Sequence, residues 1–303
     1  MPPEAKRARW KIVTGYVAFG VVSFLLGIYL TFPYDVLKER ILAEAGGQGA
    51  YVRVGSLGPG LFGITASNLE VSRKMEANED KPSPALRIDS VAIRPSLFPL
   101  GVAVRAKLLH GVASAAVGLS GDKFRVAIDD LNLQDDNLKA FSGLSLAGHL
   151  SANLTLDMPM TPSTKSQPGE PDLAQASGTV SIDASGLQVN GGTIEMIDLP
   201  KVSLGELEGK IKFEKGAGTI ETLKIKSDEV DVTVTGTPKL ARRIDYLEPN
   251  ALVKLKISPE LSKRLGLIAS GLAMLPADPQ SPEYRTLRVQ GFIGHPSSPD
   301  LRF

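Results

Sequence analysis

Charged and apolar residues alternate strictly in Glu206-Leu207-Glu208-Gly209-Lys210-Ile211-Lys212-Phe213-Glu214. Glu or Lys occupies every even position, whereas the odd positions are apolar or glycine. Successive side chains of a β-strand point to opposite faces of the sheet, so the pattern predicts a strand with one apolar and one charged face. Strands of this kind are typical of an antiparallel sheet that packs on one side only.

The same alternation continues on both sides of this stretch. Between Gly178 and Ile257 it recurs in short segments that glycines separate, which predicts strands joined by turns. The longest alternation runs from Leu144 to Met158; at about 3.3 Å per residue it would reach roughly 50 Å, which favours a long sheet over a compact barrel. Further strands are predicted at Tyr51–Leu57, Leu61–Ser72, Leu86–Ile93, Val102–Leu109, Val112–Leu119, Phe124–Leu131 and Thr286–Ile293.

The N-terminal segment has the composition of a membrane anchor. Basic residues in 1–11 precede an uncharged run from Ile12 to Phe32, which as a helix would span roughly 30 Å, the thickness of a bilayer's hydrocarbon core. Because basic residues favour the cytoplasmic side, we predict a cytoplasmic segment 1–11, a transmembrane helix 12–32 and a β domain 33–303 across the membrane. The alternative is a cleaved signal peptide, but the run is longer than a usual apolar signal region and no small-x-small cleavage site follows it.

Two helices and one loop are predicted around the strands. Tyr34 to Ala45 has the pattern of a short amphipathic helix, which would lie on the membrane surface or cap the sheet. A second helix begins with Ser258 as N-cap and Pro259 at the first helical position, and runs to Leu275, long enough to cover one end of the sheet. The proline-rich segment 159–175 predicts a flexible loop, and the strand pattern on both sides of it favours one continuous sheet.

The fold class expected from these patterns is mainly β. The N-terminal transmembrane helix is followed by an extended antiparallel sheet with short capping helices. At 43% hydrophobic residues the chain can bury an ordinary core, and its net charge is only +1. The basic residues are scattered and are not gathered with aromatic residues, which argues against a nucleic-acid partner.

The residues that usually carry chemistry are absent or poorly spaced. There is no cysteine, which excludes disulfides and thiolate metal sites, and the three histidines are far apart in the sequence. The doublets Asp129-Asp130 and Asp135-Asp136 lack a calcium-loop signature and are interpreted as turn residues. We therefore predict a protein that is not an enzyme and has no catalytic residue, cofactor or metal.

Four segments carry a resemblance to a known family. They are Phe32–Arg40, the segment Val52–Val71 with its Gly58-Pro59-Gly60, the run from Gly178 to Asp228, and the closing Leu287–Pro296. Together they cover nearly the whole chain and resemble the type II secretion system protein N family, GspN, of bacterial envelopes and the related AsmA-like envelope proteins. The resemblance implies a single-pass inner-membrane protein with a cytoplasmic N-terminus and a periplasmic β domain. It further implies a curved sheet whose concave apolar face can carry lipid, as in AsmA-like relatives.

Two functions follow as expectations. The first is an accessory interaction or assembly module of type II secretion, with other secretion components as partners and no catalysis. The second is the binding or transfer of phospholipid, with acyl chains in an apolar groove on the sheet. A closed two-layer sandwich would use the same side chains as ordinary core, because an alternating strand looks the same in both cases. The groove residues would be Leu144, Leu146, Leu150, Leu154, Leu156, Leu207, Ile211 and Phe213.

Overall fold

The computed structural model describes most of the chain beyond the predicted membrane segment. The described residues are 33–47, 50–60, 63–73, 85–161, 169–194, 197–243 and 246–291, with isolated positions at 16, 19, 20, 23, 27 and 31. The predicted transmembrane helix 12–32 thus falls almost entirely outside the described residues and stays a prediction. Within the part that the structure describes, no helix combines the length and the apolar character needed to cross a bilayer.

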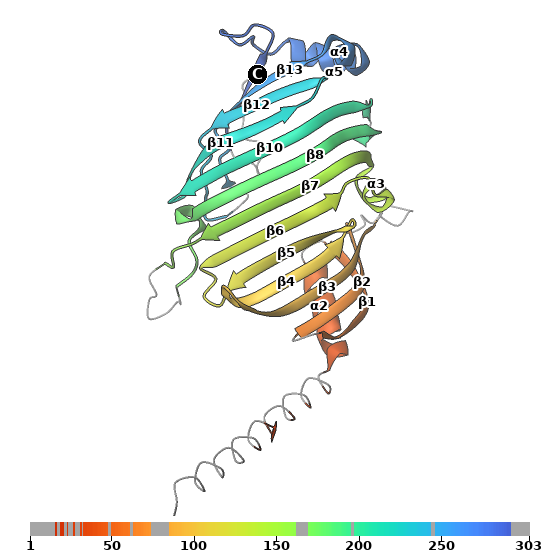
Figure 1. Ribbon diagram of the computed structural model, residues 1–303, viewed down its shortest axis with the longest axis vertical. Coiled ribbons are helices and arrows are strands. Elements are labelled where there is room, and N and C mark those ends of the chain that lie inside the picture. The colour runs from red at the N-terminus through yellow and green to blue at the C-terminus, as the bar shows by residue number, and fades with distance from the viewer. Residues whose placement is uncertain are drawn as a thin grey trace, which may run out of the picture.

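The strands form one antiparallel sheet of 14 strands that follow one another across the sheet in chain order (Figure 1). Only the short β9 departs from this order, because it pairs with β8 and leaves β10 as the next neighbour of β8. The strands are β1 (Ala50–Gly60), β2 (Gly63–Arg73), β3 (Ala85–Leu97), β4 (Leu100–Leu108), β5 (Gly111–Gly118), β6 (Lys123–Asn132), β7 (Leu144–Asp157), β8 (Ser177–Ile194), β9 (Ile197–Leu199), β10 (Val202–Glu214), β11 (Ala217–Lys226), β12 (Val230–Gly236), β13 (Ala251–Ile257) and β14 (Arg285–Val289).

The predicted mainly-β class and the long antiparallel sheet are confirmed, and each predicted strand is present with ends that differ by a few residues. The strand predicted from Leu144 onward is β7, and β8 beside it is longer still. The register between these two strands shifts twice, and Gly186 of β8 adopts a φ of 62° at one of the shifts. This is the left-handed region that glycine enters without steric cost, and it is typical of a β-bulge.

The helix predicted at Tyr34–Ala45 is confirmed as α2 (Tyr34–Gly47), which contacts β1. A further helix, α3 (Asp136–Ser142), was not predicted. Asp135 caps it by accepting a hydrogen bond of 2.8 Å from the backbone N–H of Asn137, and Gly143 ends it with a φ of 75°. The carboxylates interpreted as turn residues thus include a helix N-cap.

The predicted helix between Pro259 and Leu275 is instead two short helices. Ser258 is the N-cap, as predicted, and accepts a hydrogen bond from the N–H of Leu261. The helix α4 (Pro259–Leu265) stops at Gly266, whose φ of 55° is not helical, and α5 (Leu267–Ala273) begins after it. Both lie beside β13 at the C-terminal end of the sheet (Figure 1).

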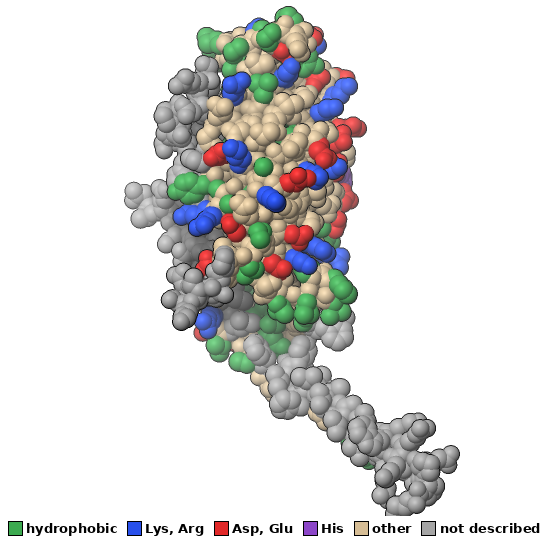
Figure 2. Space-filling model, turned by 90° about the vertical axis from the view of Figure 1, so that its left-hand side faces the viewer, with side chains coloured by type: hydrophobic (Ala, Val, Ile, Leu, Met, Phe, Trp, Pro, Cys, Tyr) green, Lys and Arg blue, Asp and Glu red, His purple; other side chains and the backbone are tan. Residues whose placement is uncertain are grey.

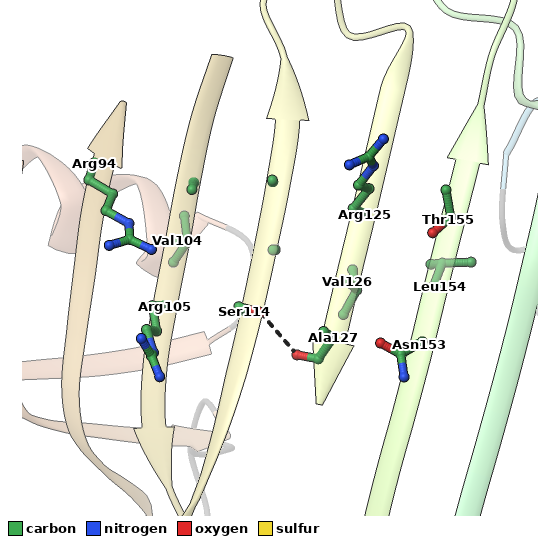
Figure 3. Close-up of a pocket in the computed structure, with 13 residues that line it drawn as sticks. Arg94, Val104, Arg105, Ser114, Arg125, Val126, Ala127, Asn153, Leu154 and Thr155 are labelled. Atoms are coloured by element: carbon green, nitrogen blue, oxygen red, sulfur yellow. Dashed lines mark hydrogen bonds between the residues drawn. The ribbon is translucent and has the colours of Figure 1, made fainter. Parts of the chain in front are cut away.

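The sheet separates charged from apolar side chains and curls at its N-terminal end. Acidic and basic side chains are dense along the right-hand side of Figure 2, the side that faces the viewer in Figure 1. At the N-terminal end, α2 and the first two strands turn behind β3–β5 (Figures 1 and 3). The apolar face is therefore concave at this end.

The closed part of the core is small for a sheet of this size. Leu156, Ala176 and Phe213 form a buried cluster near one end of β7, β8 and β10. Leu173, in the single-turn helix η1 (Leu173–Gln175), and Leu240 after β12 pack against this cluster. The described residues contain no second sheet, so the molecule is one open sheet rather than the closed sandwich considered above.

The described ends of the predicted loop 159–175 pair with each other. The N–H of Thr161 donates to the carbonyl of Glu170 at 2.8 Å, and the N–H of Asp172 donates to the carbonyl of Pro159 at 2.9 Å. Since β7 before the loop pairs directly with β8 after it, the sheet is continuous across this segment, as predicted.

Glu229 connects the β11–β12 turn to α4 and to the start of β10. Its Oε2 accepts a hydrogen bond of 2.7 Å from the backbone N–H of Ser203, and its Oε1 accepts one from Arg264 Nη2. The other arm of Arg264 donates to the carbonyl of Lys201 at 2.6 Å. The hydrogen bond from Ser203, with a further contribution from Arg264, lowers the pKa of Glu229 below its ordinary value of 4.5.

Replacing Glu229 by glutamine is expected to produce a pH-dependent loss of stability. Because the folded-state pKa is lowered, the stabilisation by the carboxylate is present above pH 4.5 and is lost as the pH falls through the lowered value. We expect Glu229→Gln to reduce the free energy of unfolding by about 1 kcal/mol at neutral pH, and the difference to shrink as the pH falls from 4.5 through the lowered folded-state pKa. Urea unfolding at three pH values measures this, with Glu206→Gln at an exposed carboxylate as control. A difference independent of pH would contradict the prediction.

Candidate functional site

The apolar face carries a row of directly paired aliphatic side chains that crosses most of the sheet. Strands lie about 4.8 Å apart, so this row reaches roughly 38 Å from β2 to β11. Paired residues lie on the same face of the sheet, and no polar side chain interrupts the row. The central row consists of Ile64, Ile93, Val104, Ala115, Val126, Leu154, Val180, Ile211 and Ile220.

Two parallel rows widen the central row on the same face, because residues two positions apart along a strand point the same way. We call the three rows together the apolar band. It contains no charged side chain, and its width is about 13 Å. The first flanking row is Leu57, Ala66, Val91, Ala106, Ala113, Ile128, Ala152, Ile182, Gly209 and Leu223; the second is Pro95, Val102, Val117, Phe124, Leu156, Gly178, Phe213 and Gly218.

The structure brings most of the predicted groove residues together through β8, which lies between β7 and β10. Leu150 and Leu207 face each other across Ala184, and Leu154 and Ile211 face each other across Val180. The remaining pair, formed by Leu156 and Phe213, has only Gly178 between its members. The small or β-branched residues of β8 therefore join the two leucine-rich strands into one surface.

The predicted groove residues differ in how open they are. Leu156 and Phe213 are 7% and 5% exposed and belong to the closed core cluster. Leu144 and Leu146 lie toward the other end of β7. Leu146 faces Val202 of β10 across Val189, whereas Leu144 lies opposite Gly192, which pairs with Leu199 of β9. Six residues of the predicted set, all except Leu156 and Phe213, are half-buried. The predicted groove is thus closed at one end and open along the rest of β7.

The sequence analysis missed the N-terminal half of the apolar band. Strands β2 to β6 supply five of the nine residues of the central row, and Ile93, Val102 and Val117 on this side are 38%, 47% and 39% exposed. The signal was present, since these segments have the same alternation that predicts β10. The continuous surface could not be predicted from these segments, because the registers of five strand pairs decide which of their side chains lie next to one another.

The apolar band ends in an exposed apolar edge at the β3–β4 turn. Leu97 and Leu100 are paired across this turn and are 73% and 63% exposed, and Phe98 between them is 87% exposed. The N–H of Leu119, itself 75% exposed, donates to the carbonyl of Leu100 at 2.9 Å. A contiguous patch of this kind is typical of a surface that meets a ligand, a partner or a membrane.

Two of the three histidines singled out in the sequence each lie beside one aspartate. His149 Nδ1 lies 2.7 Å from Asp130 Oδ1, and His110 Nδ1 lies 3.4 Å from Asp135 Oδ2. His295 lies outside the described residues. Over the described ranges, no three His, Asp or Glu side chains gather into a group that could hold a metal ion.

No protein-family model, curated protein or solved structure matches the chain. The resemblance to the type II secretion system protein N family therefore stays a prediction. The same holds for the secretion partners, the accessory role and the inner-membrane location that the resemblance implies.

Proposed function

We propose that the protein binds phospholipid, with the acyl chains lying along the apolar band. The observation that carries the proposal is the uninterrupted central row, whose side chains are half-exposed on an open sheet. Apolar surface in contact with water is unfavourable by about 25 cal/mol per Å², so a band of this size gains stability when hydrocarbon covers it. Acyl chains supply such a cover without needing any polar partner.

The dimensions of the apolar band suit this ligand. One leaflet of a bilayer contributes about half of the roughly 30 Å hydrocarbon thickness, so extended acyl chains reach about 15 Å. The band is more than twice as long, and it is wide enough for chains to lie beside one another. It can therefore hold more than one lipid, or pass a lipid from one position to the next along the sheet.

The exposed edge around Leu97, Phe98 and Leu100 offers a route by which lipid reaches the apolar band. These side chains continue the apolar face to the margin of the sheet, where a bilayer surface can contact them. Farther along the same margin, near Phe213, the apolar band is closed by the packing of Leu173 and Leu240. The proposal therefore has lipid enter at the β3–β4 turn.

The proposal is tested by asking which lipids remain with the protein. The full chain is purified in a mild non-phospholipid detergent, its bound molecules are extracted, and phospholipids are quantified by mass spectrometry. We expect at least one phospholipid per protein molecule, in a ratio that further detergent washing does not change. A purified, folded protein without phospholipid would contradict the proposal.

A further inference from the structure

The charged face has a hollow between three arginines, on the side of the sheet opposite the apolar band. Arg94 of β3, Arg105 of β4 and Arg125 of β6 line it, with a volume of about 300 Å³ (Figure 3). Asn153 and Thr155 of β7 also line it. The rest of the lining comes from the strand segments between them, at Ala103, Val104, Ser114, Ala115, Ala116, Val126, Ala127 and Leu154. Figure 3 shows the three arginine side chains on the viewer's side of the strands, with α2 behind them.

The register of the strands creates the hollow. Arg94 pairs with Ala103, Ala103 with Ala116, and Ala116 with Arg125, so two arginines lie in one row with only methyl groups between them. Their backbones are three strand spacings apart, about 14 Å, which two long side chains can bridge toward a common centre.

The third arginine belongs to the next row on the same face. Arg105 pairs with Ser114, and Ser114 pairs with Ala127, to whose carbonyl its hydroxyl donates at 3.4 Å. The floor of the hollow is therefore made of alanine and serine, and its walls of arginine.

The three arginines have no carboxylate or hydrogen-bond partner among the described residues. Some other cations on the sheet are neutralised across strands. Arg53 and Arg87 share Glu70 at 3.5 and 3.4 Å, and Lys210 pairs with Glu221 at 2.7 Å. The hollow thus concentrates positive charge that the described chain does not balance.

We propose that this arginine hollow binds a phosphate group. A guanidinium presents a planar fork of N–H donors that matches two oxygens of a phosphate, and such charge-assisted hydrogen bonds are stronger than neutral ones. The Asn153 amide and the Thr155 hydroxyl can donate to the remaining oxygens. The phosphate can belong to a free anion or to a lipid headgroup. The proposal is independent of acyl-chain binding, because the two sites lie on opposite faces.

The test uses the full chain in neutral detergent and isothermal titration with two probes. Inorganic phosphate tests the free anion, and dihexanoyl-phosphatidic acid tests the same group on a lipid. Arg105→Ala removes one of the three guanidinium groups. Ala116→Ile fills the floor of the hollow with a larger side chain and keeps all three arginines. Isoleucine is favourable in a β-strand, so we expect the sheet of this variant to form. Lys224→Ala, which removes one exposed charge elsewhere on this face, is the matched control.

Each outcome bears on the proposal. Saturable binding of either probe, weakened about tenfold or more by Arg105→Ala and by Ala116→Ile but unchanged in Lys224→Ala, supports the arginine hollow as the site. If both probes bind, a free phosphate is sufficient for binding to the hollow. If only the lipid probe binds, the ligand is a lipid headgroup. The proposal is overturned if neither probe binds, if Ala116→Ile binds as well as wild type, or if Lys224→Ala weakens binding as much as Arg105→Ala.

Discussion

Replacing Val180 by glutamate is expected to remove the bound phospholipid almost completely. Val180 stands in the middle of the central row, paired with Leu154 on one side and Ile211 on the other. A carboxylate at this position would face hydrocarbon, and a charge in the middle of an apolar layer costs about 2.5–3.5 kcal/mol. This corresponds to a loss of affinity of about a hundredfold, which mass spectrometry of the extracted lipids would record as a near absence.

The neighbouring residue provides the control. Thr179 is exposed, lies on the opposite face, and pairs with Thr155 and Lys212, so Thr179→Glu introduces the same charge on the wet side of the same strand. We expect this variant to keep its lipid. Because Val180 also packs against the core cluster, Val126→Glu repeats the test in a part of the row outside that cluster. A Val180→Glu or Val126→Glu protein that folds and keeps its full lipid content would count decisively against the apolar band as the site.

Replacing Phe213 by alanine is expected to cause a large loss of stability. The ring is 5% exposed and lies in the cluster with Leu156 and Ala176. It also covers Gly218, where a methyl group added to the glycine would come within 2.7 Å of the ring carbon Cε1. Removing a buried ring leaves a cavity, and we expect the free energy of unfolding to fall by about 3–5 kcal/mol in urea unfolding followed by circular dichroism.

A surface phenylalanine calibrates this measurement. Phe141 on α3 is 41% exposed, and Phe141→Ala is expected to change the free energy of unfolding by about 0.5 kcal/mol or less. Phe213→Leu keeps most of the buried volume and should give an intermediate value. If Phe213→Ala cost less than about 1 kcal/mol, the cluster would not be the stable centre of the fold.

The strands could be predicted because a period of two is a local property of the chain. Glu206 to Glu214 shows its two faces without reference to any other segment, and β10 follows it closely. The short helices were harder to predict. The seven residues of α3 make too few turns to show an apolar period, and only Asp135 and Gly143 marked its ends. Gly266 lies inside the single helix predicted from Pro259 to Leu275, and its φ of 55° ends α4 there.

The site depends on pairings that no single segment reveals. Phe213 looks like any other apolar residue of its strand, and its burial depends on Leu173 and Leu240, which are distant in the sequence. The arginine hollow likewise could not be predicted from any single segment. Arg94, Arg105 and Arg125 are far apart along the chain, and the scattered basic residues were interpreted only as evidence against a nucleic-acid partner. Only the registers of three successive strand pairs bring them to one hollow.

The chain-order meander has a consequence for how such a protein grows and changes. Almost every long-range pairing joins a strand to its immediate successor, so each new hairpin docks onto an edge that is already formed. Closing short loops costs little entropy, and the sheet can therefore assemble progressively from its N-terminal end while the chain is being synthesised. It also means that gaining or losing a hairpin would alter the reach of the sheet without disturbing the strands that remain, as in repeat proteins whose units contact only their neighbours. Length is then a quantity that evolution can adjust in steps of two strands.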